Sequence, residues 1–169
     1  LGAPGHDPHS LIFYCADEGI LISADALWEN GFGVIFPELD GGSGFLEARA
    51  TLDLIASLDV RVVIPGHGRP FQDAAGALQR AWSRLDYLSS DPVRNAQNAV
   101  KVLLKFLLLE RQRISLAAIP ALLRGMPIFE EANRRFLRQE AAALAEWAVS
   151  QLVRAAAARV EGEYLLNEG

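Results

Sequence analysis

The sequence has little of several residue types that carry chemistry or mark a cellular compartment. Cys15 is the single cysteine among 169 residues, which excludes an internal disulfide and gives no sign of an oxidising compartment. The longest strongly apolar run, residues 100–109, contains two lysines and is about half the roughly twenty residues that a membrane span needs. We therefore expect a cytoplasmic protein that does not enter a membrane.

A dense positive field is also missing. The net charge is −5, and it is unevenly spread: residues 1–90 carry 5 basic and 12 acidic side chains, and residues 91–169 carry 11 and 9. This balance argues against nucleic acid as a partner, because nucleic-acid binders concentrate Lys and Arg on one face. Hydrophobic residues make up 51% of the chain, enough for a sizeable core and too many for global disorder.

The first seventy residues have the pattern of an α/β fold. Apolar segments at 11–16 and 20–24 flank a turn, 17–19, that ends in glycine, and this arrangement predicts a hairpin of two strands. We place Cys15 in the core of the first of these strands. Apolar spacing predicts a helix over 45–58, and the short apolar run 61–64 predicts a buried strand, so helices should cover a sheet.

From residue 73 onward the pattern is helical. It predicts helices over 74–88, 92–111 and 115–125, a long helix over 129–158, and a final strand near 162–166. This order loosely resembles a degenerate winged-helix module, and the alternative is a plain helical subdomain. We accordingly divide the chain into a partial α/β domain, residues 1–72, and a helical C-terminal extension, residues 73–169.

Three short elements could hold a metal ion. Pro65-Gly66-His67-Gly68 directly follows the predicted strand 61–64, and Pro4-Gly5-His6 precedes the first strand. Between them, the strand 20–24 runs straight into Asp25. Glycines beside each histidine let the backbone turn sharply and approach a ligand closely. Two histidines and an aspartate at loop or strand-end positions form a candidate metal constellation.

In this order, the three elements resemble the second half of the metallo-β-lactamase superfamily, where a Pro-Gly-His loop precedes strands ending in Gly-Asp and in Pro-Gly-His-Gly. Ala24 stands where that family usually has glycine. The family's His-x-His-x-Asp-His motif is absent, since His9 is the only other histidine. The resemblance implies the C-terminal half of an αβ/βα sandwich, followed by an all-helical or degenerate winged-helix extension. We therefore expect this chain to be a piece of a longer protein.

The resemblance also implies a function, namely metal-dependent hydrolysis of a small-molecule ester, thioester or lactone. In the family, two zinc ions activate a bridging water; His6 would bind one ion, His67 the other, and Asp25 would bridge both as the catalytic carboxylate. The remaining ligands belong to the missing motif. We therefore expect weak or absent zinc binding, and no activity, from this chain alone.

Other residues and other functions stay open. His9, Trp28, Phe32 and Phe36 could line a substrate cleft, although such aromatic residues often simply pack in a core. A second hypothesis makes the extension a dimerisation or partner-binding module, on the basis of the apolar residues 100–109 and 136–153. A third is a nucleic-acid-processing relative, against which the acidic balance argues. We also expect a homo-oligomer, because half of a sandwich leaves an apolar face to cover.

Overall fold

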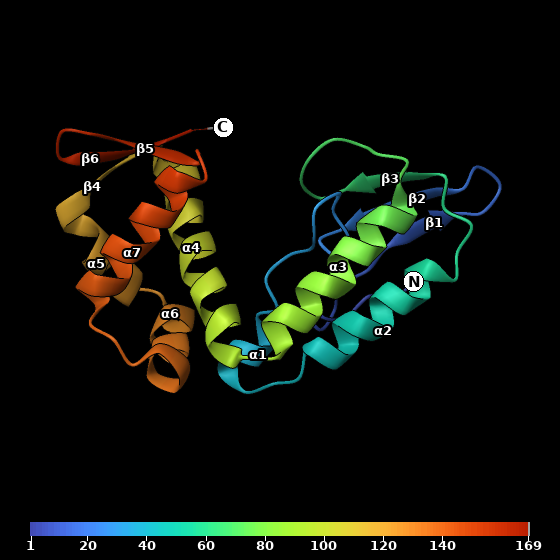
Figure 1. Cartoon of the computed structure of the whole chain (residues 1–169), viewed down its shortest axis with the longest axis horizontal. Helices are drawn as coiled ribbons and strands as arrows, with labels where there is room; N and C mark the ends of the chain where they lie inside the picture. Colours follow the sequence, from blue (N-terminus) through green and yellow to red (C-terminus); the bar gives the residue numbers. More distant parts are fainter. Residues whose placement is uncertain (169) are drawn as a thin grey trace. The chain divides into compact units, whose positions relative to one another are not determined.

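The computed structural model describes residues 1–168, which form two compact units (Figure 1). The first unit is Leu1–Arg94 and the second begins at Asn95. The first unit extends beyond the boundary that we predicted after residue 72, because helix α3 (Ala74–Ser89) contributes its buried face to the core of that unit. Each unit is described below by itself.

The first unit contains a three-stranded mixed sheet with the order β1-β2-β3. β1 (Phe13–Cys15) and β2 (Ile20–Ala24) form the predicted antiparallel hairpin. β3 (Val62–Pro65) lies parallel to β2 and is reached through helix α2 (Phe45–Ala56), so β2, α2 and β3 form a βαβ unit. The α/β prediction for this region is confirmed.

Helices cover one face of this sheet (Figure 1). Leu21 and Val63, each fully buried at the centre of its strand, share a core cluster with Leu52 and Ile55 of α2 and Leu85 of α3. The short helix α1 (Pro37–Asp40) lies in the long connection between β2 and α2. At the start of α3 the Asp73 carboxylate accepts a hydrogen bond from the Gly76 amide at 2.9 Å, which caps the helix.

The opposite face of the sheet is apolar and open. Phe13 pairs with Ile22, and Ile22 pairs with Ile64, so the three side chains form one row across the strands. Their exposed fractions are 64%, 46% and 38%. Cys15 is exposed as well, so its predicted core position is wrong: in β1 the half-buried residue is Tyr14, and its neighbours point away from the helices.

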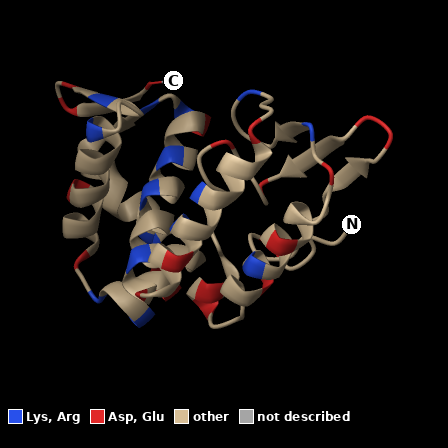
Figure 2. Ribbon diagram, turned by 45° about the vertical axis from the view of Figure 1, so that its right-hand side comes forward, with Lys and Arg blue, Asp and Glu red and all other residues tan. Residues whose placement is uncertain are grey.

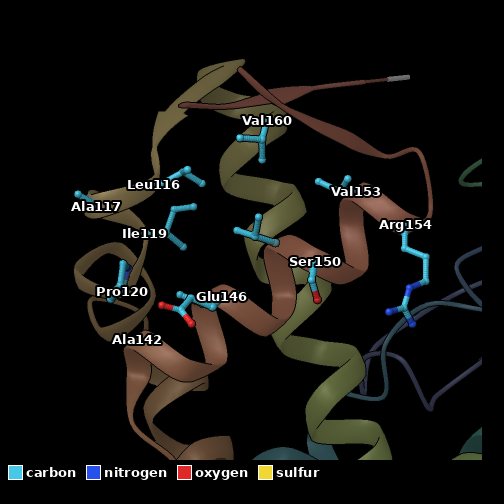
Figure 3. Close-up of a pocket in the computed structure, with 12 residues that line it drawn as sticks. Leu116, Ala117, Ile119, Pro120, Ala142, Glu146, Ser150, Val153, Arg154 and Val160 are labelled. Atoms are coloured by element: carbon cyan, nitrogen blue, oxygen red, sulfur yellow. The ribbon is translucent and has the colours of Figure 1, made fainter. Parts of the chain in front are cut away.

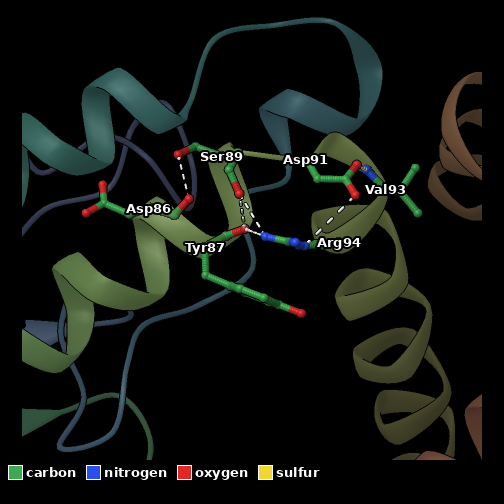
Figure 4. Close-up of polar contacts among 7 residues, drawn as sticks. Asp86, Tyr87, Ser89, Asp91, Val93 and Arg94 are labelled. Carbon is green, nitrogen blue, oxygen red and sulfur yellow. Dashed lines mark hydrogen bonds and ion pairs between the residues drawn. The ribbon is translucent and has the colours of Figure 1, made fainter.

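Local contacts tie the end of α3 to the start of helix α4 (Pro92–Arg111), as Figure 4 shows. The Asp91 carboxylate accepts a hydrogen bond from the Val93 amide at 3.0 Å and so caps the helix that was predicted to begin at residue 92. The Arg94 guanidinium donates to the Tyr87 carbonyl at 2.9 Å and lies 4.1 Å from the centroid of the Tyr87 ring.

The second unit is not all-helical, which corrects our description of the extension. It contains an antiparallel sheet with the order β4-β6-β5, made by β4 (Arg113–Ser115), β5 (Ala158–Glu161) and β6 (Tyr164–Asn167). Only the last strand was predicted. β4 and β5 have three and four residues, too few for a periodic pattern to stand out in the sequence.

The remaining elements of this unit are the 3₁₀ turn η1 (Leu116–Ala118) and helices α5 (Ile119–Arg124), α6 (Pro127–Ala132) and α7 (Ala141–Arg154). A strand thus follows α4, helices come next, and a two-stranded hairpin ends the unit. This is the element order of the winged-helix module that the sequence loosely resembled.

The predicted helix over 129–158 is broken in its first third. A π-helical turn, η2 (Asn133–Leu137), follows α6, and Arg138 then adopts a left-handed conformation with φ of 51°. The Asn133 side chain holds the break, donating to the Gln139 carbonyl at 2.9 Å and accepting from the Gln139 amide at 3.1 Å. Since no glycine or proline lies at the break, the sequence pattern gave no sign of it.

Phe129 lies in the core of the second unit, and Lys105 links two of its elements through hydrogen bonds. Phe129 is fully buried, in a unit whose other buried residues include Leu104 and Leu144. The Lys105 ammonium donates to the Ala157 carbonyl at 2.8 Å and to Asn167 Oδ1 at 2.6 Å, and so ties α4 to the terminal hairpin. Within residues 1–168, none of the helices combines the length and the apolar character that a membrane crossing needs.

Candidate metal centre

Two of the predicted ligands lie at one edge of the first unit's sheet. Asp25 directly follows β2, and His67 lies two residues beyond the end of β3. Because β2 and β3 are parallel neighbours, their carboxyl ends meet at the same edge. His6 reaches this edge from the loop that precedes β1. The fold thus brings together residues that are up to 61 positions apart in the sequence.

Asp25 stands between the two histidines. His6 Nε2 is 3.5 Å from Asp25 Oδ2, and His67 Nε2 is 3.7 Å from Asp25 Oδ1. The histidines therefore face different oxygens of one carboxylate and do not converge on one point. Accordingly, the described part of the chain contains no group of three or more His, Cys, Asp or Glu side chains arranged to hold one metal ion.

The spacing of each pair nevertheless fits a shared zinc ion. With zinc–ligand bonds of about 2.1 Å and tetrahedral angles, two ligands of one ion lie about 3.4 Å apart. Both nitrogen–oxygen distances are close to this value. The Asp25 side chain is 29% exposed and that of His67 is 62% exposed, so further ligands can reach both sides of the carboxylate. The three residues fit part of a two-metal site in which Asp25 bridges.

A backbone carbonyl fixes the orientation of the His6 ring. His6 Nδ1 lies 2.6 Å from the Val34 carbonyl oxygen, and because a carbonyl can only accept, Nδ1 carries the hydrogen. In the neutral ring, Nε2 is then the unprotonated nitrogen, and it is the one that faces Asp25. This is the arrangement found around metal-binding histidines, whose second nitrogen donates to a carbonyl or carboxylate. Phe36 stands beside the ring, with centroids 5.4 Å apart.

Trp28 contacts both Asp25 and His67. Its indole Nε1 donates a hydrogen bond to Asp25 Oδ1 at 3.1 Å. Its ring meets the His67 ring edge-on, with centroids 5.2 Å apart and an interplanar angle of 79°. We predicted Trp28 as a wall of the substrate cleft; in the structure it holds the carboxylate and restricts the imidazole.

Two glycines make the close approach of these side chains possible. A Cβ atom at Gly33 would lie 2.6 Å from His6 Nδ1, and one at Gly66 would lie 2.6 Å from Asp25 Oδ1. Real Cβ contacts are never this short, so any side chain would displace the histidine or the carboxylate. Gly66 belongs to the predicted motif. Gly33 and Val34 were missed, because only the glycine-rich run after Asp25 hints that this loop turns back toward the site.

The other residues that we predicted to line a substrate cleft lie in different environments. Phe32 is 4% exposed and packs in the core, with the Arg84 guanidinium 5.8 Å from its ring centroid, and it lines only the small cavity beside His6 and Asp25. His9 is exposed, and its backbone amide donates to Asp7 Oδ1 in a surface turn. The cavity beside His6 and Asp25 measures only about 10 Å³, room for about one water molecule. This cavity beside the candidate ligands is too small to enclose a substrate.

Residues 1–67 match the family model of the metallo-beta-lactamase superfamily. Among solved structures, the chain is similar to a metallo-beta-lactamase family protein from Thermus thermophilus, with 22% identity and a TM-score of 0.43 over 100% of this chain and 48% of that one. It is also similar to a beta-lactamase domain protein from Burkholderia ambifaria, with 19% identity and a TM-score of 0.45 over 98% of this chain and 46% of that one.

The chain thus spans about half the length of the solved structures that it matches. No curated protein matches it. The matched segment contains the Pro-Gly-His loop, the β1–β2 hairpin, Asp25 and β3, and it ends on His67, the last of the three converging residues. Residues 1–67 are thus similar to the metallo-β-lactamase superfamily.

Proposed function

We propose that residues 1–94 contribute one side of a two-zinc site in a hydrolase that cleaves a small-molecule ester, thioester or lactone in the cytoplasm. The observation that carries this proposal is the placement of His6 and His67 on different oxygens of Asp25, each at the spacing of two ligands on one zinc ion. Bound zinc supplies an activated water at neutral pH and neutralises charge that develops on the substrate.

Each residue has a separate task in this proposal. His6 would hold one ion through Nε2, since Nδ1 is engaged by the Val34 carbonyl. His67 would hold the other, and Asp25 would offset part of the positive charge of both ions. Trp28 would keep the carboxylate in its bridging orientation. The isolated chain provides one histidine and one carboxylate oxygen for each ion, so we expect weak zinc binding and no turnover from it.

Isothermal titration of the 169-residue chain with zinc chloride tests the ligand assignment. We expect His6→Ala and His67→Ala each to weaken the measured binding, because each leaves one ion with a single ligand, and Asp25→Asn to weaken it most, because Asp25 serves both ions. His9→Ala is the matched control, since His9 is an exposed loop histidine three residues from His6. Equal loss in the His9 variant, or undiminished binding in the other three, would contradict the assignment.

The reaction class needs a separate test in a chain that also carries the His-x-His-x-Asp-His half. We expect such a protein to hydrolyse members of a panel of generic thioesters, lactones and carboxylic esters with added zinc. Asp25→Asn and His67→Ala should remove the activity. A phosphodiester belongs in the panel, because cleavage of that substrate alone would favour the nucleic-acid-processing alternative.

A further inference from the structure

The second unit contains an apolar groove of about 770 Å³ (Figure 3). It runs between η1 and α5 on one side and α7 on the other, with β5 at one end. Its apolar lining includes Leu116, Ile119, Val149, Val153 and Val160. Val153 and Val160 are 41% and 47% exposed, so the groove leaves apolar side chains in contact with water.

The α7 wall of the groove carries an ordered set of polar residues. Glu146, Ser150 and Arg154 follow one another at intervals of four and therefore share one stripe of the helix. The stripe has an acid at one end, a base at the other and a small residue midway between them (Figure 3). The two charges are about 12 Å apart along the helix axis. Among the described residues, neither Glu146 nor Arg154 has a recorded hydrogen bond or ion pair.

This stripe is complementary to itself when reversed. If a second α7 lies antiparallel to the first with Ser150 facing Ser150, each Glu146 faces the partner's Arg154. A two-fold interface requires this property, because residue i must contact residue j while j contacts i. The small side chain of Ser150, on the axis, lets the two helix backbones approach closely.

We propose that the groove is the contact surface between two copies of this chain, which pair through antiparallel α7 helices about a two-fold axis at Ser150. Val153 of each copy enters the groove of the other, and the Glu146–Arg154 pairs close its two ends. The proposal is independent of the metal site, which lies in the first unit.

Nucleic acid fits this surface poorly, although α7 holds the place of the recognition helix in a winged-helix module. The α7 stripe carries one base and one acid, and the turn between β5 and β6 adds Glu161 and Glu163. A phosphate backbone would face more negative than positive charge along this path. The groove is therefore suited to an apolar surface with charges of both signs, as a second α7 provides.

Charge reversal tests the pairing directly. Glu146→Arg or Arg154→Glu alone would turn two attractive pairs into two repulsive ones, so we expect the dimer dissociation constant from sedimentation equilibrium to rise about tenfold or more. The double variant should restore it, because it exchanges the partners. Glu130→Arg, the same charge change at an exposed site in α6, should have no effect.

Cross-linking at the axis provides a second, more local readout. In a Cys15→Ser background, Ser150→Cys places the single thiol of each copy beside that of its partner, and a short bis-maleimide should convert most of the protein to a covalent dimer. Gln139→Cys, an exposed position outside the groove, should give little dimer.

Several outcomes would overturn the proposal. A chain that stays monomeric up to millimolar concentration has no second copy in the groove. Single reversals that weaken association without rescue in the double variant exclude the antiparallel arrangement. Association that ignores both reversals and gives no Ser150→Cys cross-link uses another surface, such as the open face of the first unit's sheet.

Discussion

The two units bury their apolar residues in different ways. In the first, helices α2 and α3 cover one face of the sheet, while the row Phe13, Ile22 and Ile64 stays open on the other. In the second, the helices gather around buried residues such as Phe129, and the exposed apolar surface includes the α7 groove. The first unit is therefore one sheet with a single helical cover, whereas the second has a core with helices around it. Figure 2 colours the ribbon at the Lys, Arg, Asp and Glu residues of both units.

The candidate metal ligands are also divided unequally between the two units. All three predicted ligands lie at the sheet edge of the first unit, where two parallel strands end. The second unit holds no histidine at all. The candidate ligands that the sequence predicted therefore all belong to the first unit. Changes in one unit should leave the properties of the other intact.

The largest effect is expected in the core of the second unit. Phe129→Ala should lower its free energy of unfolding by about 3–5 kcal/mol, because a fully buried aromatic side chain is removed and leaves a cavity. Phe106→Ala is the matched control: Phe106 is 45% exposed on α4, so the loss there should be under about 1 kcal/mol. Urea denaturation followed by circular dichroism measures both.

The expected independence of the two units would be contradicted if Phe129→Ala also removed zinc binding at His6, Asp25 and His67. That result would mean that the two units fold as one cooperative block. We expect zinc titrations of the Phe129 variant below its unfolding transition to match those of the unchanged chain.

The open sheet face should give the next effect. The triple variant Phe13→Thr, Ile22→Thr and Ile64→Thr keeps β-branched residues suited to strands and removes most of the exposed apolar row. We expect the fluorescence of a dye that binds apolar surfaces to fall by about half, with little change in the unfolding midpoint. A triple replacement of exposed polar residues is the control. Unchanged dye fluorescence would show that the groove of the second unit is the main apolar surface.

Candidate site residues, secondary structure and detailed backbone geometry could be predicted from the sequence to different extents. His6 and His67 were found because each adjoins a glycine next to a predicted strand, and Asp25 because it directly follows one. The proximity of Asp25 and His67 follows from the parallel pairing of β2 with β3, which the order strand, helix, strand already favours. The ligand roles themselves remain predictions.

The structural features that the sequence did not predict depend on tertiary contacts, and such contacts produce no periodic pattern in the sequence. The break at Arg138 is held by the side chain of Asn133, and Asn133 alone does not distinguish a helix from its end. The burial of Phe32 depends on Arg84, which is 52 residues further along the chain. Similarly, the Val34 carbonyl reaches His6 only once the loop has folded.

A smaller effect should separate Trp28 from a tryptophan with the same hydrogen bond elsewhere. Trp28 Nε1 donates to Asp25 Oδ1 at 3.1 Å, and Trp82 Nε1 donates to Asp53 Oδ1 at the same distance. Trp28→Phe should weaken zinc binding about tenfold, because it removes a partner that orients a proposed ligand. Trp82→Phe should leave zinc binding unchanged.

Intrinsic fluorescence provides an independent readout of the same pair. Zinc should change tryptophan emission in the Trp82 variant and have little effect in the Trp28 variant, since Trp28 lies against His67 and Asp25. If the two variants lose affinity equally, Trp28 has no special role at the site.

The smallest expected effect concerns Ala24, the residue that stands where the family usually has glycine. Ala24 adopts φ of 46°, a left-handed conformation that costs an L-residue about 1 kcal/mol. Ala24→Gly should therefore raise the stability of the first unit by about 0.5–1 kcal/mol in urea denaturation. Ala156 in the second unit has φ of 52°, so Ala156→Gly should stabilise that unit by a similar amount. Ala143→Gly, at an exposed interior position of α7, should instead destabilise it by about 1 kcal/mol.

Zinc titration distinguishes Ala24 from Ala156, because only Ala24 adjoins a proposed ligand. Ala24→Gly should alter the zinc titration slightly, and Ala156→Gly should leave it unchanged. A loss of stability in Ala24→Gly would show that the alanine methyl group makes a contact worth more than the relief of its backbone strain.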